Sequence, residues 1–208
     1  MTSARVFLLD DDPVQLVFIG GVLRSARYVI ETFAQPDALL ARISPKDRGC
    51  MVLDWKMPGQ NGLQLHAALL GRGVLLPVIF MSGSADIPVA VEAMRQGAVH
   101  FLTKPVDAAA LLEMVAHAMQ KDAAAAADRT MRTELRLKWA TLSLREQDVC
   151  RLCAQGMLIK QVGAALGLTD STVQAHRSKA LAKLGVANVA DLIKLLTLLE
   201  RVSTENQR

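Results

Sequence analysis

Four short apolar runs, separated by helix-length stretches, constrain the fold of this chain more than any other feature. The runs are Val6 to Leu9, Cys50 to Leu53, Val78 to Met81 and Val99 to Leu102. Short apolar runs that include β-branched residues are typical of strands buried on both faces of a sheet. Parallel strands need long connections, which are usually helices that cover the sheet. The pattern therefore predicts an α/β fold with a doubly wound parallel sheet.

Each run is followed closely by side chains that can carry chemistry. They belong to Asp10, Asp11, Asp12, Asp54, Ser82 and Lys104. Because ligands of open parallel sheets bind at the carboxyl ends of the strands, we expect these groups to meet at one edge. Clustered carboxylates repel one another unless a cation joins them, and Mg²⁺ prefers oxygen ligands. Asp54 can then act as a nucleophile that forms an aspartyl phosphate, with Ser82 and Lys104 holding the phosphoryl group.

Over residues 1–120 the chain resembles the receiver domain of bacterial two-component response regulators. The resemblance rests on the residues above and on Met57-Pro58-Gly59-Gln60-Asn61-Gly62, Ser82-Gly83, Gly97-Ala98 and Lys104-Pro105. It implies a five-stranded, flavodoxin-like sheet. It also implies that a partner histidine kinase phosphorylates Asp54.

The resemblance further implies a role for each residue at this site. The expected ligands of the Mg²⁺ cofactor are Asp10, Asp11, Asp54 and the backbone carbonyl of Lys56. Ser82 and Lys104 are expected to contact the phosphoryl group. Phe101 falls on the aromatic switch position, which turns inward when Ser82 moves toward the phosphate. Asp12 is expected to have only a supporting role, because the family uses two acids there.

Charge is divided unevenly along the chain. Residues 1–120 carry 10 Lys+Arg and 11 Asp+Glu, a net charge of −1, whereas residues 121–208 carry 14 and 9, a net charge of +5. The full length of 208 residues is enough for two domains of ordinary size. We predict a receiver domain over 1–120, a helical linker over 121–140 and a DNA-binding domain over 141–208, because a basic segment is the candidate for nucleic acid.

The stretch between the predicted domains has the composition of a helix. Leu111, Leu112, Val115 and Met119 have helical spacing, and an uninterrupted run of alanines follows at 123–127. Alanine has the highest helix propensity. We therefore expect one long helix from about 107 into the 130s. A flexible tether is the alternative, but such linkers are usually rich in glycine, serine or proline.

The basic part of the chain begins with a helix-capping pattern. Ser143, followed three residues later by Glu146, predicts a capping box at the start of an amphipathic helix. A short helix over about 159–166 follows, and a glycine turn leads into another helix that Thr169 or Asp170 caps. Two short helices joined by such a turn indicate a helix-turn-helix motif, whose second helix enters the major groove.

The outer side of that second helix carries the predicted DNA contacts. Gln174 and Arg177 are candidates for reading bases, because glutamine pairs with adenine and arginine with guanine. Other contacts orient the protein on phosphates without specifying sequence. The predicted DNA-binding residues are Lys160, Thr169, Ser171, Thr172, Gln174, Ala175, His176, Arg177, Ser178, Lys179 and Lys183. For any single Lys or Arg, a solvated helix face is the alternative.

Residues 140–200 resemble the LuxR-type DNA-binding domain. The resemblance rests on Leu142-Ser143-x-Arg145-Glu146, Gly156, Lys160-x-Val162, Leu166-Gly167-Leu168, Thr172-Val173-x-x-His176-Arg177 and Lys183-Leu184. Joined to a receiver, this domain gives the NarL/FixJ class of transcriptional regulators. The segment that runs from Ala85-Asp86 to Met94 looks closest to the FixJ branch.

The last predicted helix is the candidate for self-association. Asn188 can cap it, and its apolar side is formed by Leu192, Leu195, Leu196 and Leu199. In the resembling family the corresponding helix mediates dimerisation on DNA, so we expect a homodimer when the protein is phosphorylated. A dimer reads two half-sites about one helical turn apart. Packing within the monomer is the alternative role of this helix.

The remaining sequence features bear on redox chemistry and location. Cys50, Cys150 and Cys153 are expected to pack as small buried hydrophobes rather than to bind metal or form a disulfide. No signal peptide is visible at the amino terminus, and no apolar stretch reaches the length of a membrane span. We therefore expect a cytoplasmic protein that has no membrane partner.

Together these features predict a DNA-binding transcriptional response regulator, switched by phosphorylation of Asp54, that is not an enzyme for separate substrates. Its expected partners are promoter DNA, a sensor histidine kinase and a second copy of the chain. A phosphatase or phosphotransferase that uses Asp54 as nucleophile is one alternative, but it would need a second acid nearby and a pocket-forming insertion. A phosphorylation-independent DNA-binding protein, with the receiver as a dimerisation scaffold, is the other.

Overall fold

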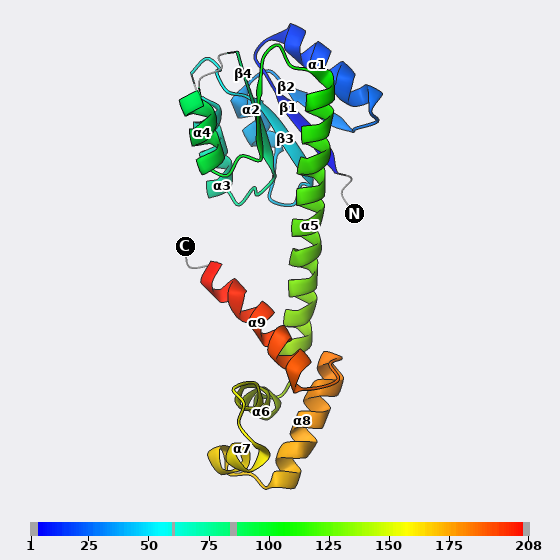
Figure 1. The fold of residues 1–208 in the computed structure, drawn as a ribbon, viewed down its shortest axis with the longest axis vertical. Helices are drawn as coiled ribbons and strands as arrows, with labels where there is room; N and C mark the ends of the chain where they lie inside the picture. Colours follow the sequence, from blue (N-terminus) through cyan, green and yellow to red (C-terminus); the bar gives the residue numbers. More distant parts are fainter. Residues whose placement is uncertain (1–3, 60, 84–86, 206–208) are drawn as a thin grey trace. The chain divides into compact units, whose positions relative to one another are not determined.

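The computed structural model describes residues 4–59, 61–83 and 87–205 (Figure 1). The chain divides into two compact units, Met1–Ala126 and Ala127–Arg208. The division falls within one continuous helix, α5 (Ala108–Ala140). Three residues of the sequence motifs, Gln60, Ala85 and Asp86, lie outside the described residues.

The first unit contains a five-stranded parallel sheet, which confirms the predicted α/β fold. Its strands are β1 (Arg5–Leu9), β2 (Ile30–Phe33), β3 (Gly49–Asp54), β4 (Val78–Ser82) and β5 (His100–Thr103), in the order β2-β1-β3-β4-β5. Four strands overlap the four apolar runs. The run-based prediction missed β2 because Glu31 and Thr32 interrupt its apolar pattern. An edge strand that is only partly buried tolerates such residues.

Helices cover both faces of this sheet, as Figure 1 shows. They are α1 (Pro13–Ser25), α2 (Pro36–Arg42), α3 (Gly62–Gly71), α4 (Ile87–Arg95) and the first part of α5. Alternate residues of β1 point to opposite layers. Val6 and Leu8 pack with α1 and α5, whereas Phe7 and Leu9 pack with α2, α3 and α4, and all four are fully buried. This arrangement places the carboxyl ends of all five strands along one edge.

The long helix α5 confirms the prediction of a continuous helix at the junction. Its residues up to Ala126 belong to the first unit, although 121–140 was expected to be linker. Asp122 is buried there and accepts hydrogen bonds from Arg48 Nε at 2.8 Å and from the Gly49 backbone N at 3.0 Å. Residue 49, which donates one of these bonds, must be glycine, because the Cβ of any other residue would lie 1.8 Å from the Arg5 carbonyl oxygen.

The second unit is a small helical domain. It contains the end of α5 and the helices α6 (Leu144–Ala154), α7 (Ile159–Leu166), α8 (Asp170–Leu184) and α9 (Val189–Glu205). The predicted capping box at Ser143 is present. Gly167 ends α7 with a φ of 68°, a left-handed conformation that favours glycine. Together α7 and α8 form the predicted helix-turn-helix.

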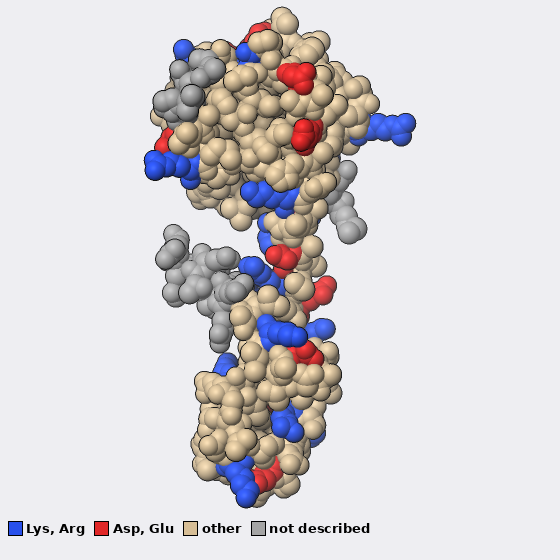
Figure 2. Space-filling view, in the orientation of Figure 1, with Lys and Arg blue, Asp and Glu red and all other residues tan. Residues whose placement is uncertain are grey.

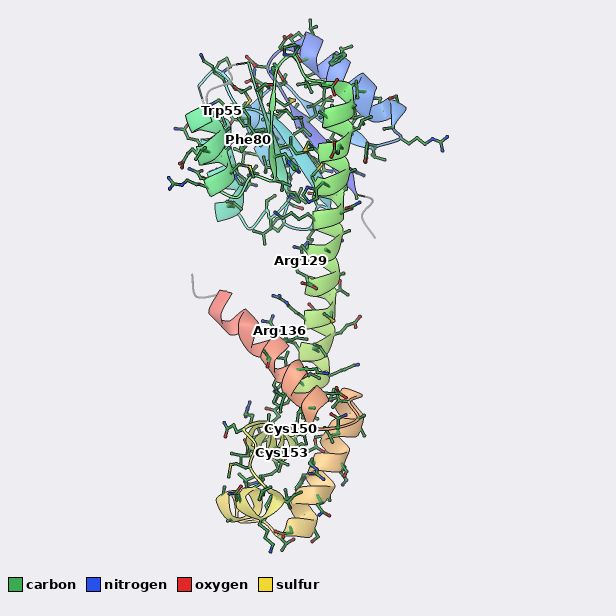
Figure 3. The ribbon with its side chains drawn as sticks, in the orientation of Figure 1. Trp55, Phe80, Arg129, Arg136, Cys150 and Cys153 are labelled. Atoms are coloured by element: carbon green, nitrogen blue, oxygen red, sulfur yellow. The ribbon has the colours of Figure 1, made fainter. Side chains whose placement is uncertain are left out.

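The three cysteines are buried free thiols, as expected from their packing role. Burial raises the pKa of Cys50 to about 12 and that of Cys150 to about 11. Cys150 and Cys153 lie on α6 (Figure 3), where they pack in the interior of the second unit. The thiols therefore stay protonated at neutral pH and behave as apolar groups.

The carboxy-terminal helix is capped as predicted, since Asn188 Oδ1 accepts a hydrogen bond from the Asp191 backbone N at 2.9 Å. Leu192 and Leu195 are buried in the second unit, and Leu196 and Leu199 pack against the same core while staying partly exposed. Intramolecular packing thus accounts for much of the apolar side of α9. Across the described residues, no helix combines the length and the apolar character that a membrane span requires.

Candidate functional site

The carboxyl ends of four strands hold the predicted phosphoryl site. Asp10 follows β1, Asp54 ends β3, Ser82 ends β4 and Lys104 follows β5. The Lys104 Nζ lies 2.7 Å from Asp10 Oδ2 and 2.9 Å from Asp54 Oδ1. Carboxylate oxygens of Asp10, Asp11 and Asp54 lie within 4.8 Å of one another. The fold therefore brings together all five of these predicted residues at one sheet edge.

Burial and charge act on Asp54 in opposite directions. Burial raises the pKa of Asp54, and the charges of Asp10 and Asp11 raise it further, while the hydrogen bond from Lys104 lowers it; the net pKa is raised. Burial lowers the pKa of Lys104, but its hydrogen bonds to Asp10 and Asp54 outweigh this effect and raise it. Lys104 therefore stays cationic and neutralises part of a carboxylate cluster that is costly to bury.

The same cluster fits a divalent cation. Its three carboxylates are the oxygen ligands that Mg²⁺ takes in proteins. Asp10 and Asp54 are buried while Asp11 is exposed, so the cluster is open to solvent on the side of Asp11. Lys56 forms an isolated bridge with Asn61, which holds the backbone that carries the predicted carbonyl ligand. A bound cation would share Asp10 and Asp54 with Lys104.

Asp12 contributes to the site through its neighbours. Its side chain accepts a hydrogen bond from the Val14 backbone N at 2.8 Å and so caps α1. Its own backbone N donates to Asp10 Oδ1 at 3.0 Å. Asp12 therefore orients Asp10 while its carboxylate is engaged by the helix.

The aromatic residues next to the site form a contact chain. Trp55, directly after Asp54, packs edge-on against Phe80 with ring centroids 5.4 Å apart (Figure 3), and against Phe101 at 6.3 Å. Phe101 is partly buried and packs on the side of the sheet that α3 and α4 cover. Ser82 is 2% exposed and sits on β4 beside Thr103 of β5. The sequence motifs did not indicate that Trp55, which follows Asp54 in the chain, contacts the ring of Phe101.

The predicted DNA contacts gather on α7, α8 and the turn between them. The exposed members are Lys160, Thr169, Ser171, Gln174, Ala175, Ser178, Lys179 and Lys183, and the partly buried ones are Thr172, His176 and Arg177. On the inner side of α8, Val173, Ala180 and Leu184 are buried, and Leu181 is partly buried. On the face that Figure 2 shows, Lys and Arg outnumber Asp and Glu over the second unit. The outer side of α8 is thus a polar surface that can approach a phosphate backbone.

Several of these residues already have structural partners. Thr169 caps α8: its Oγ1 accepts from the Thr172 backbone N at 3.3 Å. Lys183 Nζ lies 2.6 Å from Glu146 Oε2, the carboxylate of the capping box. That hydrogen bond, followed by the one from the Ser143 backbone, lowers the pKa of Glu146. Lys183 therefore joins α8 to the start of α6, a role that spacing alone did not indicate.

Comparison with known proteins agrees with both parts of the structure. The family described as "Response regulator receiver domain" matches residues 6–116, and the family "Bacterial regulatory proteins, luxR family" matches residues 140–196.

Relatives match along most of the chain. Nodulation protein W of Bradyrhizobium diazoefficiens is 35% identical to this chain, and the match covers 93% of this chain and 86% of the relative. The transcriptional regulatory protein FixJ of Azorhizobium caulinodans is 34% identical, and the match covers 94% of this chain and 93% of the relative. Among solved structures, the response regulator StyR is 34% identical, covers 94% of this chain and 99% of its own, and has a TM-score of 0.82. The structure of full-length FixJ from B. japonicum is 27% identical, covers 97% of this chain and 99% of its own, and has a TM-score of 0.58. With a receiver unit followed by a LuxR-type helix-turn-helix unit, the chain belongs to the response regulators of the NarL/FixJ class.

Proposed function

We propose that Asp54 accepts a phosphoryl group from a sensor histidine kinase and that the phosphorylated chain dimerises and binds promoter DNA in the cytoplasm. The observation that carries this proposal is the Lys104 ammonium held between Asp10 and Asp54. A fixed cation beside a carboxylate at a strand end is suited to a transferred phosphoryl group. The only substrate proposed is the chain's own Asp54, so the protein is not an enzyme for separate molecules.

In the proposed reaction an Asp54 oxygen attacks the phosphorus of the kinase's phosphohistidine. The phosphorus–nitrogen bond breaks, and its electron pair stays on the imidazole nitrogen. Mg²⁺, held by Asp10, Asp11, Asp54 and the Lys56 carbonyl, would reduce repulsion between the carboxylates and the phosphoryl oxygens. Lys104 then pairs with a phosphoryl oxygen in place of the Asp54 oxygen, and the Ser82 hydroxyl donates to another.

The proposed signal passes through β4 and β5. A phosphoryl group adds up to about two negative charges at Asp54. As Ser82 moves toward it, Phe101 turns further into the space beside Trp55, which it already contacts. The surface of β5 then favours a second copy of the chain. Two weakly binding helix-turn-helix units that are joined in this way gain affinity without new DNA contacts.

In the proposed complex, α8 enters the major groove. Gln174 and Arg177 read base edges, and the surrounding Lys, Thr and Ser side chains contact phosphates. Lys160 on α7 and Lys179 on α8 are exposed and can reach the backbone of the DNA. Lys183 is bound to Glu146 and contributes less.

The phosphotransfer proposal is tested with labelled acetyl phosphate and Mg²⁺. The wild-type chain is expected to be labelled once, and Asp54→Asn is expected to lose the label completely, because an amide cannot act as the nucleophile. Asp12→Asn is the matched control: it removes a charge two residues from Asp10 but keeps the cap on Val14, since asparagine caps as well as aspartate.

Labelling of Asp12→Asn should therefore persist at a comparable level. Undiminished labelling of Asp54→Asn would contradict the assignment of the phosphoacceptor. DNA binding that is unaffected by labelling would instead favour the phosphorylation-independent regulator.

A further inference from the structure

Two histidines meet at the end of the sheet opposite the phosphoryl site. His100 is the first residue of β5 and His117 lies on α5. His100 Nε2 and His117 Nδ1 are 2.6 Å apart, and the ring centroids are 4.9 Å apart. Lys104 follows the other end of β5, four residues away or roughly 13 Å along an extended strand. The pair is therefore separate from the carboxylate cluster.

At this distance one ring must donate its proton to the lone pair of the other, so at least one imidazole is neutral. His100 is half-buried and His117 is exposed, which leaves the pair open to solvent on one side. Burial lowers the pKa of His100, and His117 and Lys121 lower it further, while Glu113 acts in the opposite direction. Glu113 lies one helical turn before His117 and places a negative charge near the two rings.

We propose that His100 and His117 form a binding site for a divalent transition-metal ion that prefers imidazole nitrogen, such as nickel, copper or zinc. Two imidazole nitrogens that lie 2.6 Å apart on one surface are of the type that such ions select as ligands, whereas magnesium selects the carboxylate cluster. A bound ion would take the place of the proton between the rings, and the donor ring would carry a proton on its other nitrogen instead, so that both imidazoles bind as neutral ligands. It would join β5 to α5 through the two side chains.

The geometry requires only a small adjustment. Nitrogen–metal bonds of about 2.05 Å at a tetrahedral angle place two ligand nitrogens roughly 3.3 Å apart. The rings must therefore separate by several tenths of an ångström from their present 2.6 Å. The His117 side chain can make this movement because it is exposed on the surface of α5. Water, or the Glu113 carboxylate after a change of rotamer, would fill the remaining positions.

The site is tested by titrating the untagged full-length protein with Ni²⁺ in excess Mg²⁺, which occupies the carboxylate cluster. Isothermal titration calorimetry is expected to show saturable binding of one ion per chain. His117→Ala should weaken this binding at least tenfold, and His100→Gln should do the same. His176→Gln is the matched control, because it removes an imidazole from the second unit and should leave the affinity unchanged.

A cysteine contribution is separated with the Cys150→Ser/Cys153→Ser double variant, which should also bind Ni²⁺ as the wild type does. As a second readout, the Cu²⁺-loaded wild type should show nitrogen hyperfine splitting in its electron paramagnetic resonance spectrum, and His117→Ala should lose it. The proposal is overturned if no saturable binding occurs up to millimolar Ni²⁺. It is also overturned if binding survives both histidine substitutions.

Discussion

The predicted phosphoryl site and the predicted DNA-contacting surface on α7 and α8 are built in opposite ways. In the first, Asp10, Asp54 and Ser82 are at most 4% exposed, and one lysine bridges two carboxylates. In the second, Lys160 and Gln174 stand exposed on their helices. Groups that share a buried partner depend on one another, whereas separated surface groups contribute independently. The first region should therefore fail as a unit, and the second should weaken residue by residue.

The largest expected effect is on the first region. Lys104→Met removes the cation that Asp10 and Asp54 share, and so leaves neighbouring carboxylates unneutralised. We expect the free energy of unfolding of the first unit to fall by about 3 kcal/mol at pH 7.5 without Mg²⁺. Added Mg²⁺ should restore part of this loss, because a bound cation substitutes for the ammonium. Urea denaturation with and without Mg²⁺ measures both effects.

The control for this variant is Lys56→Met, which removes an exposed lysine beside the same site. Its stability should stay within about 0.5 kcal/mol of the wild type. Equal losses for the two variants would show that the bridging position of Lys104 has no special importance.

On the predicted DNA-contacting surface, substitutions of base-reading residues and of phosphate-contacting residues should have different effects on DNA binding. Gln174→Ala should cost about 1–3 kcal/mol on the preferred sequence and relax the base preference. Lys160→Ala should weaken binding to all sequences alike and reduce the salt dependence by about one counterion. Lys183→Ala should change the salt dependence less, because Glu146 already neutralises that lysine. Anisotropy titrations on two DNA sequences at several salt concentrations distinguish these outcomes, and identical behaviour of all three variants would refute the assignment.

Within the second unit, replacing Glu146 should lower the stability for the same reason as replacing Lys104 at the predicted phosphoryl site, but by a smaller amount. Glu146→Ala removes both the capping hydrogen bond to Ser143 and the ion pair with Lys183, so we expect a loss of about 1 kcal/mol in unfolding free energy. Glu146→Gln keeps an oxygen for Ser143 and should lose less. Thermal unfolding followed by circular dichroism compares the two. If glutamine costs as much as alanine, the cap contributes little.

An effect of similar size is expected for Asp54, whose ionisation makes the stability of the first unit depend on pH. Its pKa is raised in the folded state, so ionisation destabilises the fold; the cost is absent below the ordinary pKa of 3.8 and complete above the folded pKa. Without Mg²⁺, Asp54→Asn should therefore be more stable than the wild type by about 1 kcal/mol at pH 7.5. This advantage should shrink as the pH falls toward 4. A wild type that is the more stable protein at pH 7.5 would contradict the electrostatic description.

The sequence predicted those parts of the molecule that have strong local signals. Buried parallel strands leave uninterrupted apolar runs, and the capping residues Ser143 and Asn188 mark helix starts that the structure confirms. Contacts between residues that are far apart in the sequence left no such signal. The Asp122 contact with Arg48 joins residues 74 positions apart, and the imidazole pair of His100 and His117 depends on how β5 packs against α5.

The edge strand β2 and the role of Trp55 were missed for related reasons. Half-buried strands mix polar and apolar residues, so Ile30–Phe33 did not stand out. Trp55 matters through its two ring neighbours, Phe80 and Phe101, which are contributed by other strands. At the predicted phosphoryl site and on the predicted DNA-contacting surface, the residues that carry the chemistry could be named from sequence motifs. The contacts between those residues could be known only from the fold.

The most direct test of the proposed switch is the DNA affinity of the wild type and of Asp54→Asn with and without acetyl phosphate and Mg²⁺. The probe is a DNA fragment selected from a random pool by the acetyl phosphate-treated wild type, and fluorescence anisotropy reports the dissociation constant. We predict that acetyl phosphate lowers this constant about tenfold or more for the wild type, roughly 1.4 kcal/mol, and leaves Asp54→Asn unchanged. An equal response of the two proteins, or no response of the wild type, would contradict the claim that phosphorylation of Asp54 controls DNA binding.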